Sequence, residues 1–400
     1  MIANLAQGLR RMAGDPPGTS TRSLWGFWLY AGQLLTVAAI AASNVLLGLA
    51  VLTVPWRRAR PWLMRGRPLL LALGLYLIGL TGSILASHAP LTSARAASDF
   101  FNFLAPVVAL IVVRRERQVR LIIKAFILLG CAVSIHALVQ YSLGFNHIEQ
   151  RPVGPFSHYM TLAGFLVFVD CLLLSWIVFG RGWRRWWSWL ALVLIQLALL
   201  ASLTRNAWIA VAIIAIVLMI LKAPKLLLAT VPAAVVIILL MPGPTVSRIG
   251  SIFDYRNLSN YDRLCMIYAG AHMIRDRPLL GQGPGMVRER YSLYRHPSAP
   301  RDWVPHLHNS FLSVAAERGL VSLAALIAVL AVSTRESIRA LRRPDDGSQT
   351  PVDLHATVLL VVLATVTTGM FEDYWRDTEI QRLVFFALAL PFCLKAPTDD

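Results

Sequence analysis

The stretch His306-Leu307-His308-Asn309-Ser310-Phe311 lies where a polar, arginine-bearing segment, residues 242–305, meets an apolar run that continues to Ser333. Histidines and an asparagine at the mouth of a membrane helix cost free energy unless they face water, partners or a substrate. Most other apolar segments are interpreted as scaffold. We therefore expect the chemistry of the protein at this junction.

The composition places the chain in a membrane. It is 56% hydrophobic and 15% charged, with a mean hydropathy of +0.60, far from the average of soluble domains. Apolar runs of membrane-spanning length recur from Leu24 to Leu394. Residues 1–23 are polar and basic and have no cleavage pattern, so we expect the first helix to be retained. The predicted fold class is an all-α polytopic membrane protein.

The net charge of +17 is explained by membrane topology and not by nucleic-acid binding. Most basic residues fall in short linkers that alternate with linkers poor in Lys and Arg, as the positive-inside rule requires. These linkers are therefore placed in the cytoplasm. They lie at residues 57–67, 114–120, 181–185, 222–225 and 335–343.

About twelve transmembrane helices fit this pattern, with both ends of the chain in the cytoplasm. Ser43-Asn44 is expected to divide residues 24–56 into a hairpin of two spans. The other spans are predicted at about 69–87, 98–113, 121–141, 158–179, 187–203, 206–221, from Lys225 to 241, 308–333, 353–371 and 379–394. The chain thus divides into residues 1–241 with nine helices, an external loop at 242–307, and residues 308–400 with three helices.

The external segment 242–305 departs from the charge rule, because nine arginines face five acidic residues on the side where positive charge is sparse. One interpretation is a solvated loop that touches anionic lipid headgroups. A more specific one is a phosphate site, since guanidinium groups bind phosphate oxygens bidentately. The four cysteines form no paired framework and no C-x-x-C motif, so neither a disulfide scaffold nor a zinc site is indicated.

Two arginines stand at predicted external helix starts. Residues 262–276 read as a surface helix with Asp262 as its cap and Pro278 after its end, which puts Arg263 in the first turn. The helix dipole disfavours a cation there, so an anion is expected close by. Arg205, which follows Thr204 at the start of the span 206–221, is likewise a cation at a helix N-terminus. A salt bridge to a protein carboxylate is the alternative for each arginine.

His308 is also predicted at a helix N-terminus, where the dipole disfavours the imidazolium and a neutral imidazole can accept a proton. A hydrogen bond to a headgroup or to backbone is the alternative, but His306, Asn309 and Glu317 nearby favour a site. His-x-His can also bind a metal ion, yet no carboxylate cluster or third histidine is close in sequence, so no metal site is predicted.

A second external turn, residues 151–158, carries Arg151 and His158 around fixed Pro and Gly positions. These two side chains are candidates to point at the same cavity. A purely structural turn is the alternative.

Four motifs together resemble the O-antigen ligase and polymerase superfamily. They are Thr204-Arg205-Asn206-Ala207-Trp208, Asp262-Arg263-Leu264, Pro278-Leu279-Leu280-Gly281-Gln282-Gly283-Pro284-Gly285, and His308-Asn309 followed by Glu317-Arg318-Gly319. The spacing from His308-Asn309 to Gly319 is similar to that of the bacterial O-antigen ligase, although Ser322 stands where that family usually has Gly, Thr or Tyr. The motifs cover about residues 200–322.

The resemblance implies a fold like that of C-type glycosyltransferases and a metal-independent, inverting glycosyltransferase of the bacterial inner membrane, with no cofactor. Such enzymes transfer O-antigen from undecaprenyl diphosphate to a sugar hydroxyl of the lipid A core in the periplasm, a step of lipopolysaccharide maturation. His308 matches the base, Arg205 and Arg263 match arginines that hold the donor diphosphate, and Arg288 is a third candidate by position only. The supporting candidates are His306, Asn309, Arg151 and His158.

Other classes remain open at this stage. An O-antigen polymerase or a protein O-glycosyltransferase would share these motifs and differ in the acceptor. The absence of a large C-terminal periplasmic domain disfavours the protein-modifying branch. A transporter of lipid-linked glycans would carry polar residues at mid-membrane, whereas here they cluster at one face. A scaffold that binds anionic lipids would tolerate the loss of single arginines.

Overall fold

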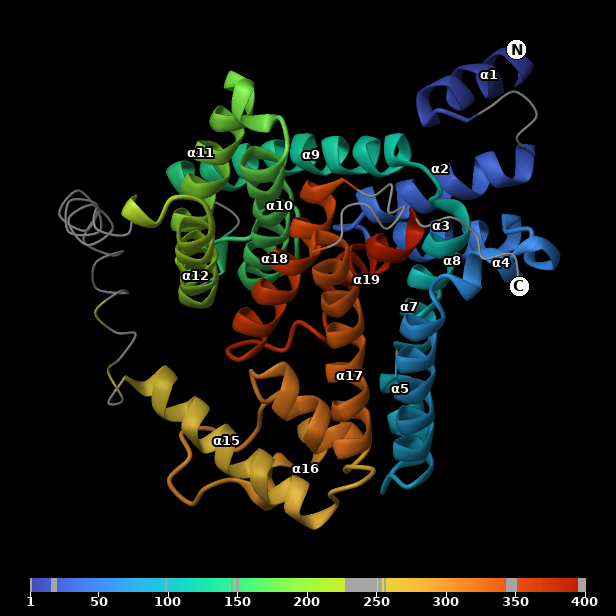
Figure 1. The fold of residues 1–400 in the computed structure, drawn as a ribbon. Helices are drawn as coiled ribbons and strands as arrows, with labels where there is room; N and C mark the ends of the chain where they lie inside the picture. Colours follow the sequence, from blue (N-terminus) through green and yellow to red (C-terminus); the bar gives the residue numbers. More distant parts are fainter. Residues whose placement is uncertain are drawn as a thin grey trace.

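The computed structural model describes residues 2–15, 20–97, 99–144, 147–148, 151–226, 250, 254, 257–342 and 351–394. In these residues the chain is almost entirely helical, with one antiparallel hairpin of two short strands, β1 (His147–Ile148) and β2 (Arg151–Pro152). Figure 1 shows a bundle of helices with a smaller helical lobe at one end.

The first half of the chain supplies one side of the bundle. Its helices are α1 (Ile2–Ala13), α2 (Thr21–Leu35), α3 (Ile40–Thr53), η1 (Trp56–Arg58), α4 (Arg60–Met64), α5 (Arg67–Leu85), α6 (Pro90–Ala96), α7 (Asp99–Asn102), α8 (Leu104–Val112) and α9 (Glu116–Leu143). The second half adds the rest of the bundle and the lobe. Its helices are α10 (Tyr159–Phe179), η2 (Gly182–Arg184), α11 (Trp186–Ala201), α12 (Arg205–Lys222), η3 (Pro224–Leu226), α15 (Leu258–Asp276), α16 (Met286–Tyr294), α17 (Ser310–Arg342), α18 (Val352–Gly369) and α19 (Thr378–Cys393).

Seven stretches of the described chain are long and apolar enough to cross a membrane. They are Arg67–Leu85, Pro90–Val112, Glu116–Leu143, Tyr159–Phe179, Arg205–Lys222, Ser310–Arg342 and Val352–Gly369, and α3 and α11 are shorter apolar helices. The all-α, multi-pass class is therefore confirmed. The ninth predicted span, from Lys225 to 241, falls mostly on residues outside the described ones, so the number of twelve stays a prediction.

The predicted break at Ser43-Asn44 is wrong. The first hairpin turns earlier, at residues 36–39, between the end of α2 at Leu35 and the start of α3 at Ile40. Ser43 lies within α3, where its hydroxyl donates to the carbonyl oxygen of Gln33 at 2.8 Å. Both Ser43 and Asn44 accept hydrogen bonds from the buried guanidinium of Arg382 in α19. The side-chain oxygens of these two residues therefore accept hydrogen bonds from a buried cation, and the residues do not form a turn.

The predicted cap of the external helix is also wrong. The helix α15 begins at Leu258, one turn before the predicted start, and Asn257 is its cap, with its side-chain oxygen accepting from the Ser259 N–H at 3.1 Å. Asp262 and Arg263 therefore lie within the helix, and the dipole argument does not apply to Arg263. It does apply to Arg205, which is the first residue of α12 behind Thr204.

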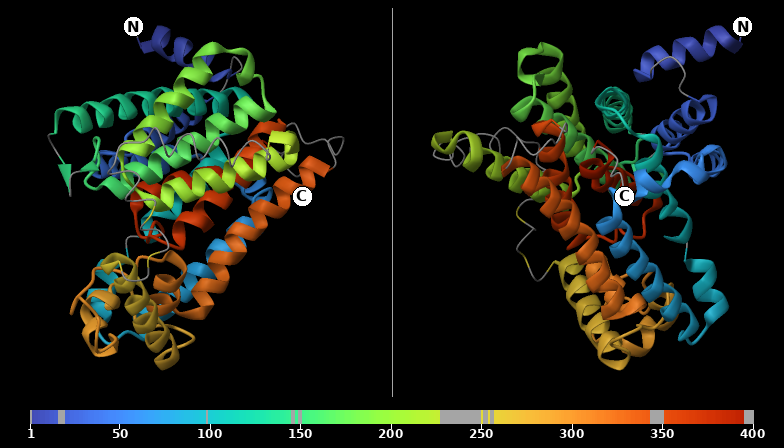
Figure 2. Two further views of the ribbon diagram at one scale, coloured as in Figure 1. Left: turned by 90° about the vertical axis from the view of Figure 1, so that its left-hand side faces the viewer. Right: turned by 45° about the vertical axis from the view of Figure 1, so that its right-hand side comes forward.

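The lobe is built from α15, α16 and the N-terminal part of α17, and it has a small core of its own. The core residues are Met266, Ala269, Met273, Val287, Tyr291, Val304, Leu307 and Ala316. Both views of Figure 2 show α17 running from this lobe into the bundle beside α5. The long α17 therefore connects the lobe to the membrane-spanning helices.

The motif Glu317-Arg318-Gly319 forms the joint between lobe and bundle. The helical path of α17 is interrupted at Gly319, whose φ of 81° and ψ of 171° favour glycine. Backbone hydrogen bonds join this point to the loop 278–285, from the Gly283 N–H to Glu317 at 2.8 Å and from the Leu320 N–H to Pro278 at 2.8 Å. This motif therefore has a structural role.

Candidate functional site

A polar cavity of about 2400 Å³, open to solvent, lies where the lobe meets the bundle. Six separate segments of the chain contribute its lining: Ile40 at the start of α3, residues 151–161 before and at the start of α10, the start of α12, the first half of α15, the residues before α17, and the turn between α18 and α19. Its charged and histidine side chains are Arg151, His158, Arg205, Asp262, Arg263, Arg301, His306, His308, Glu372, Asp373, Arg376, Asp377 and Glu379. Residues that are up to 339 positions apart, Ile40 and Glu379, thus share one cavity.

Six of the eight residues singled out from the sequence line this cavity: His308, His306, Arg205, Arg263, Arg151 and His158. Arg288 does not line it, because its guanidinium lies over the ring of Trp303, 5.3 Å from the centroid. Asn309 does not line it either. Its side chain accepts from the Leu312 N–H at 2.9 Å and donates to Met370 at 3.2 Å, so it caps α17 and ties it to α18.

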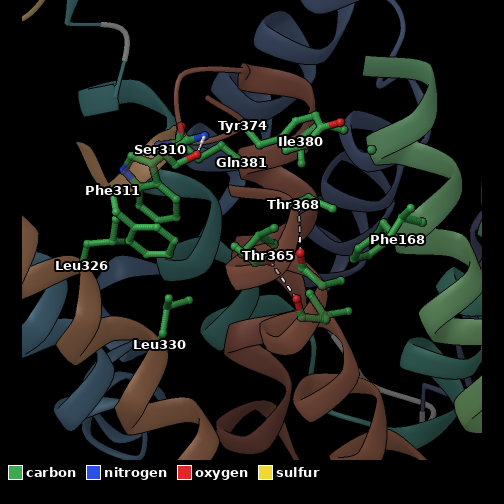
Figure 3. Close-up of a pocket in the computed structure, with 16 residues that line it drawn as sticks. Phe168, Ser310, Phe311, Leu326, Leu330, Thr365, Thr368, Tyr374, Ile380 and Gln381 are labelled. Atoms are coloured by element: carbon green, nitrogen blue, oxygen red, sulfur yellow. Dashed lines mark hydrogen bonds between the residues drawn. The ribbon is translucent and has the colours of Figure 1, made fainter. Parts of the chain in front are cut away.

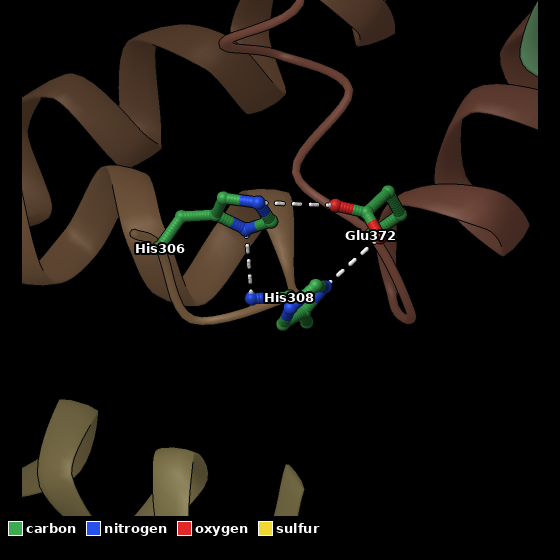
Figure 4. Close-up of side chains that lie close together, drawn as sticks. All are labelled: His306, His308 and Glu372. Carbon is green, nitrogen blue, oxygen red and sulfur yellow. Dashed lines mark hydrogen bonds and ion pairs between the residues drawn. The ribbon is translucent and has the colours of Figure 1, made fainter. Parts of the chain in front are cut away.

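His308 is paired with a carboxylate that sequence analysis missed. Its Nδ1 lies 2.9 Å from Oε2 of Glu372, and Nε2 of His306 lies 3.5 Å from Oε1 of the same carboxylate (Figure 4). The His308 backbone N–H also donates to Nδ1 of His306 at 3.3 Å. His308 itself has a φ of 47°, in the left-handed region that non-glycine residues rarely adopt. The histidine pair is therefore held in one arrangement by Glu372.

The charges of this group follow from burial and from its hydrogen bonds. Burial lowers the pKa of His306 to about 4, so its ring is neutral at neutral pH. Burial alone would raise the pKa of Glu372, but the hydrogen bond from His308, with smaller contributions from its other neighbours, outweighs burial, and that pKa falls to about 2. Glu372 is therefore a carboxylate anion beside two imidazoles.

The ligand atoms of His306, His308 and Glu372 lie within 4.8 Å of one another, and they form the one group with metal-binding spacing that the described part of the chain contains. Two imidazoles and a carboxylate are a known ligand set for Zn²⁺ and similar ions. No metal site was predicted because no carboxylate cluster or third histidine is close to His308 in the sequence. The fold brings the carboxylate of Glu372, 64 residues later in the chain, next to His308. The same atoms serve equally well as a hydrogen-bonded base.

Arg263 contributes a half-buried positive charge to the cavity and makes no hydrogen bond or ion pair with any described residue. The carboxylate beside it in sequence, Asp262, is already engaged by Arg301, whose Nε donates to Oδ2 at 2.7 Å. No carboxylate of the described residues therefore forms a salt bridge with Arg263. A guanidinium at the wall of a cavity without a partner in the described part of the chain is suited to bind an anion.

Other basic residues of the cavity have protein contacts. The guanidinium of Arg151 is buried and lies 4.2 Å from the centre of the Tyr159 ring. Arg376 donates to the carbonyl oxygen of Pro305 at 2.7 Å, which ties the α18–α19 turn to the residues before His308. These contacts order the cavity wall.

The turn between α18 and α19, residues 371–377, is the part of the site that sequence analysis missed. It places four charged residues in six positions, Glu372, Asp373, Arg376 and Asp377, between two apolar helices. The reasoning applied to residues 306–311 applies equally to this turn, because charged groups at a membrane face need partners or a substrate. The local charge density was therefore the signal that could have found it.

An apolar pocket with about 590 Å³ of empty space lies among α10, α17, α18 and α19 (Figure 3). Phe168, Phe311, Leu326 and Leu330 are among its lining residues. Tyr374 lines both this pocket and the polar cavity. Apolar and polar binding surfaces thus meet at the turn that carries Glu372.

Residues 190–327 match the family described as O-antigen ligase. This segment is therefore similar to O-antigen ligases. The match covers about a third of the chain and contains Arg205, Arg263, His306 and His308, while Glu372 lies beyond its end. No curated protein matches the chain. The match suggests an enzyme of glycosyltransferase type that acts on lipid-linked glycans in a membrane. The cavity brings cations and imidazoles together in one place.

Proposed function

We propose that this protein is an inverting, metal-independent glycosyltransferase that transfers O-antigen polysaccharide from undecaprenyl diphosphate to a sugar hydroxyl of the lipid A core. The observation that carries the proposal is Arg263, a guanidinium without a partner among the described residues, in the same cavity as the imidazole of His308. The superfamily match supports a reaction on lipid-linked glycans.

In this proposal the arginines stabilise the leaving group. When the bond between the sugar C1 and the phosphate oxygen breaks, its electron pair stays on the diphosphate, whose negative charge increases. Fixed guanidinium groups stabilise that charge without reorganisation. Arg263 is the primary contact in this proposal, and Arg205 at the start of α12 is the second.

His308 acts as the base. A sugar hydroxyl is a poor nucleophile, and loss of its proton to a neutral imidazole in the transition state helps the attack. The proton passes to His308, the acceptor oxygen forms the new bond to C1, and the diphosphate leaves from the opposite face. Inversion at C1 follows from this geometry.

The site is proposed to face the periplasm of the bacterial inner membrane. The residues that line the cavity belong to segments that alternate along the chain with the basic linkers, and the positive-inside rule places those linkers in the cytoplasm. In this orientation both lipid substrates stay in the bilayer while their polar headgroups meet at its outer face.

The test is a transfer assay with purified protein in detergent, undecaprenyl-diphosphate glycan and lipid A core. Glycan should appear on the core with the unmodified protein and not with His308→Ala, while that variant still binds the donor. Longer lipid-linked glycan with an unmodified core would replace the ligase by a polymerase. Normal transfer by His308→Ala would remove the base assignment.

A further inference from the structure

We propose that Glu372 is the positioning residue of the base, and that it acts through both oxygens of its carboxylate, one on His308 and one on His306. This inference rests on the proposed function, because it assigns a partner to the base of that reaction. Glu372 lies in the turn between α18 and α19, outside the segment that matches the family.

The first step is the tautomer of His308. A carboxylate only accepts hydrogen bonds, so the contact of 2.9 Å between Oε2 of Glu372 and Nδ1 of His308 puts the ring hydrogen on Nδ1. The lone pair then resides on Nε2. A ring that lines the cavity with an unprotonated Nε2 is ready to accept the proton of an acceptor hydroxyl.

The second step is the orientation of Glu372, which His306 helps to fix. Nδ1 of His306 accepts from the His308 backbone N–H, so its Nε2 carries the hydrogen and points to Oε1 of Glu372 at 3.5 Å. The Asp373 backbone N–H donates to the same oxygen at 3.0 Å. Both oxygens of Glu372 are thus directed, and His306 also holds the left-handed backbone at His308.

The third step is charge. When His308 takes the proton it becomes a cation in a half-buried site, and Glu372, whose side chain is 8% exposed, is the anion beside it. In hydrolases with a histidine base, loss of the equivalent carboxylate charge lowers kcat by about 10⁴. We expect a loss of kcat on the order of 10² or more for a neutral residue at position 372, with an unchanged KM for the donor.

The test compares three variants in the transfer assay. Glu372→Gln keeps the shape and an oxygen for the Asp373 N–H but loses the charge, and it should lose kcat without a change in thermal stability. Glu372→Asp should recover part of the activity. Glu372→Ala should regain activity when sodium formate is added, since formate can supply the missing carboxylate. Asp302→Asn is the matched control, because Asp302 is exposed and pairs with Arg295 at the lobe surface, away from the cavity lining.

Full kcat in Glu372→Gln would overturn the proposal, and so would a loss in Glu372→Ala that formate does not restore. A readout without turnover separates this failure from failure of the proposed function. Diethyl pyrocarbonate modifies unprotonated imidazole, and mass spectrometry can compare His308 with the exposed His272 of the same protein. Faster modification of His308 in the unmodified protein than in Glu372→Gln is expected, and equal rates would refute the positioning role even if no glycan is transferred.

Discussion

Replacing Gly319 by alanine should loosen the lobe from the bundle. Gly319 has a φ of 81° and a ψ of 171°, a region that residues with a side chain almost never adopt. A Cβ at this position would overlap the carbonyl oxygen of Leu279 and lie 2.6 Å from the backbone nitrogen of Leu280. These are backbone atoms, so no side chain can turn away to make room.

The expected cost has two parts. Forcing alanine into this conformation costs about 1–3 kcal/mol. Moving the loop 278–285 away from α17 weakens at least one backbone hydrogen bond, such as that from the Leu320 N–H to Pro278, for about 1 kcal/mol more. The sum is roughly 3 kcal/mol, which corresponds to about a hundredfold increase in the population of the opened joint.

Limited trypsin digestion measures this opening, because Arg275 and Arg288 lie on either side of the loop. Cleavage there should be about a hundredfold faster in Gly319→Ala than in the unmodified protein. Gly74→Ala is the control, since Gly74 lies within α5 and a Cβ there would have no atom within 4 Å. Equal cleavage of Gly319→Ala and unmodified protein would refute the account of the joint.

Three further predictions concern the cavity. Arg263→Lys should weaken donor binding by about tenfold or more, because a lysine cannot bind phosphate oxygens bidentately. Titration with undecaprenyl diphosphate measures this affinity. The control Arg295→Lys, in the lobe, should leave donor binding unchanged. Activity should survive extensive EDTA treatment, and a strict requirement for an added divalent ion would instead assign a metal to His306, His308 and Glu372. The free energy of unfolding should fall by at most about 3 kcal/mol as the pH drops from about 6.5 to about 4. In this pH range His306 binds a proton in the unfolded chain, whereas in the folded protein its pKa of about 4 keeps it neutral. Thermal unfolding of His306→Gln should lose that part of the pH dependence, and identical curves would exclude this origin.

The sequence predicted the membrane class and much of the cavity lining for one physical reason. Polar side chains at the ends of apolar helices are costly, so Arg205 and His308 stand out without any structure. The structure places both, with Arg263, at one cavity. Residues 371–377 have the same character and could have been found in the same way.

The errors arose where a residue's partner lies far away in the chain. Asp262 has the residue type of a helix cap, but Asn257 takes that position and Arg301 engages Asp262. Ser43 has the residue type of a turn, but it accepts a hydrogen bond from Arg382, 339 residues later. The pairing of Glu372 with His308 is of the same kind, and periodicity along the sequence carries no information about it.

Arg382 joins α19 to helices that come hundreds of residues earlier in the chain. Its guanidinium is buried in α19 and donates to Asn102 at 2.9 Å, to Ser43 at 2.7 Å and to Asn44. A buried guanidinium without hydrogen-bond partners costs free energy, so these contacts are needed wherever α19 packs. Ser43 precedes Arg382 by 339 residues, so the hairpin of α2 and α3 is synthesised long before the donor that its polar groups require. A chain truncated before α19 should therefore keep these acceptors without Arg382 and be recognised as incompletely folded.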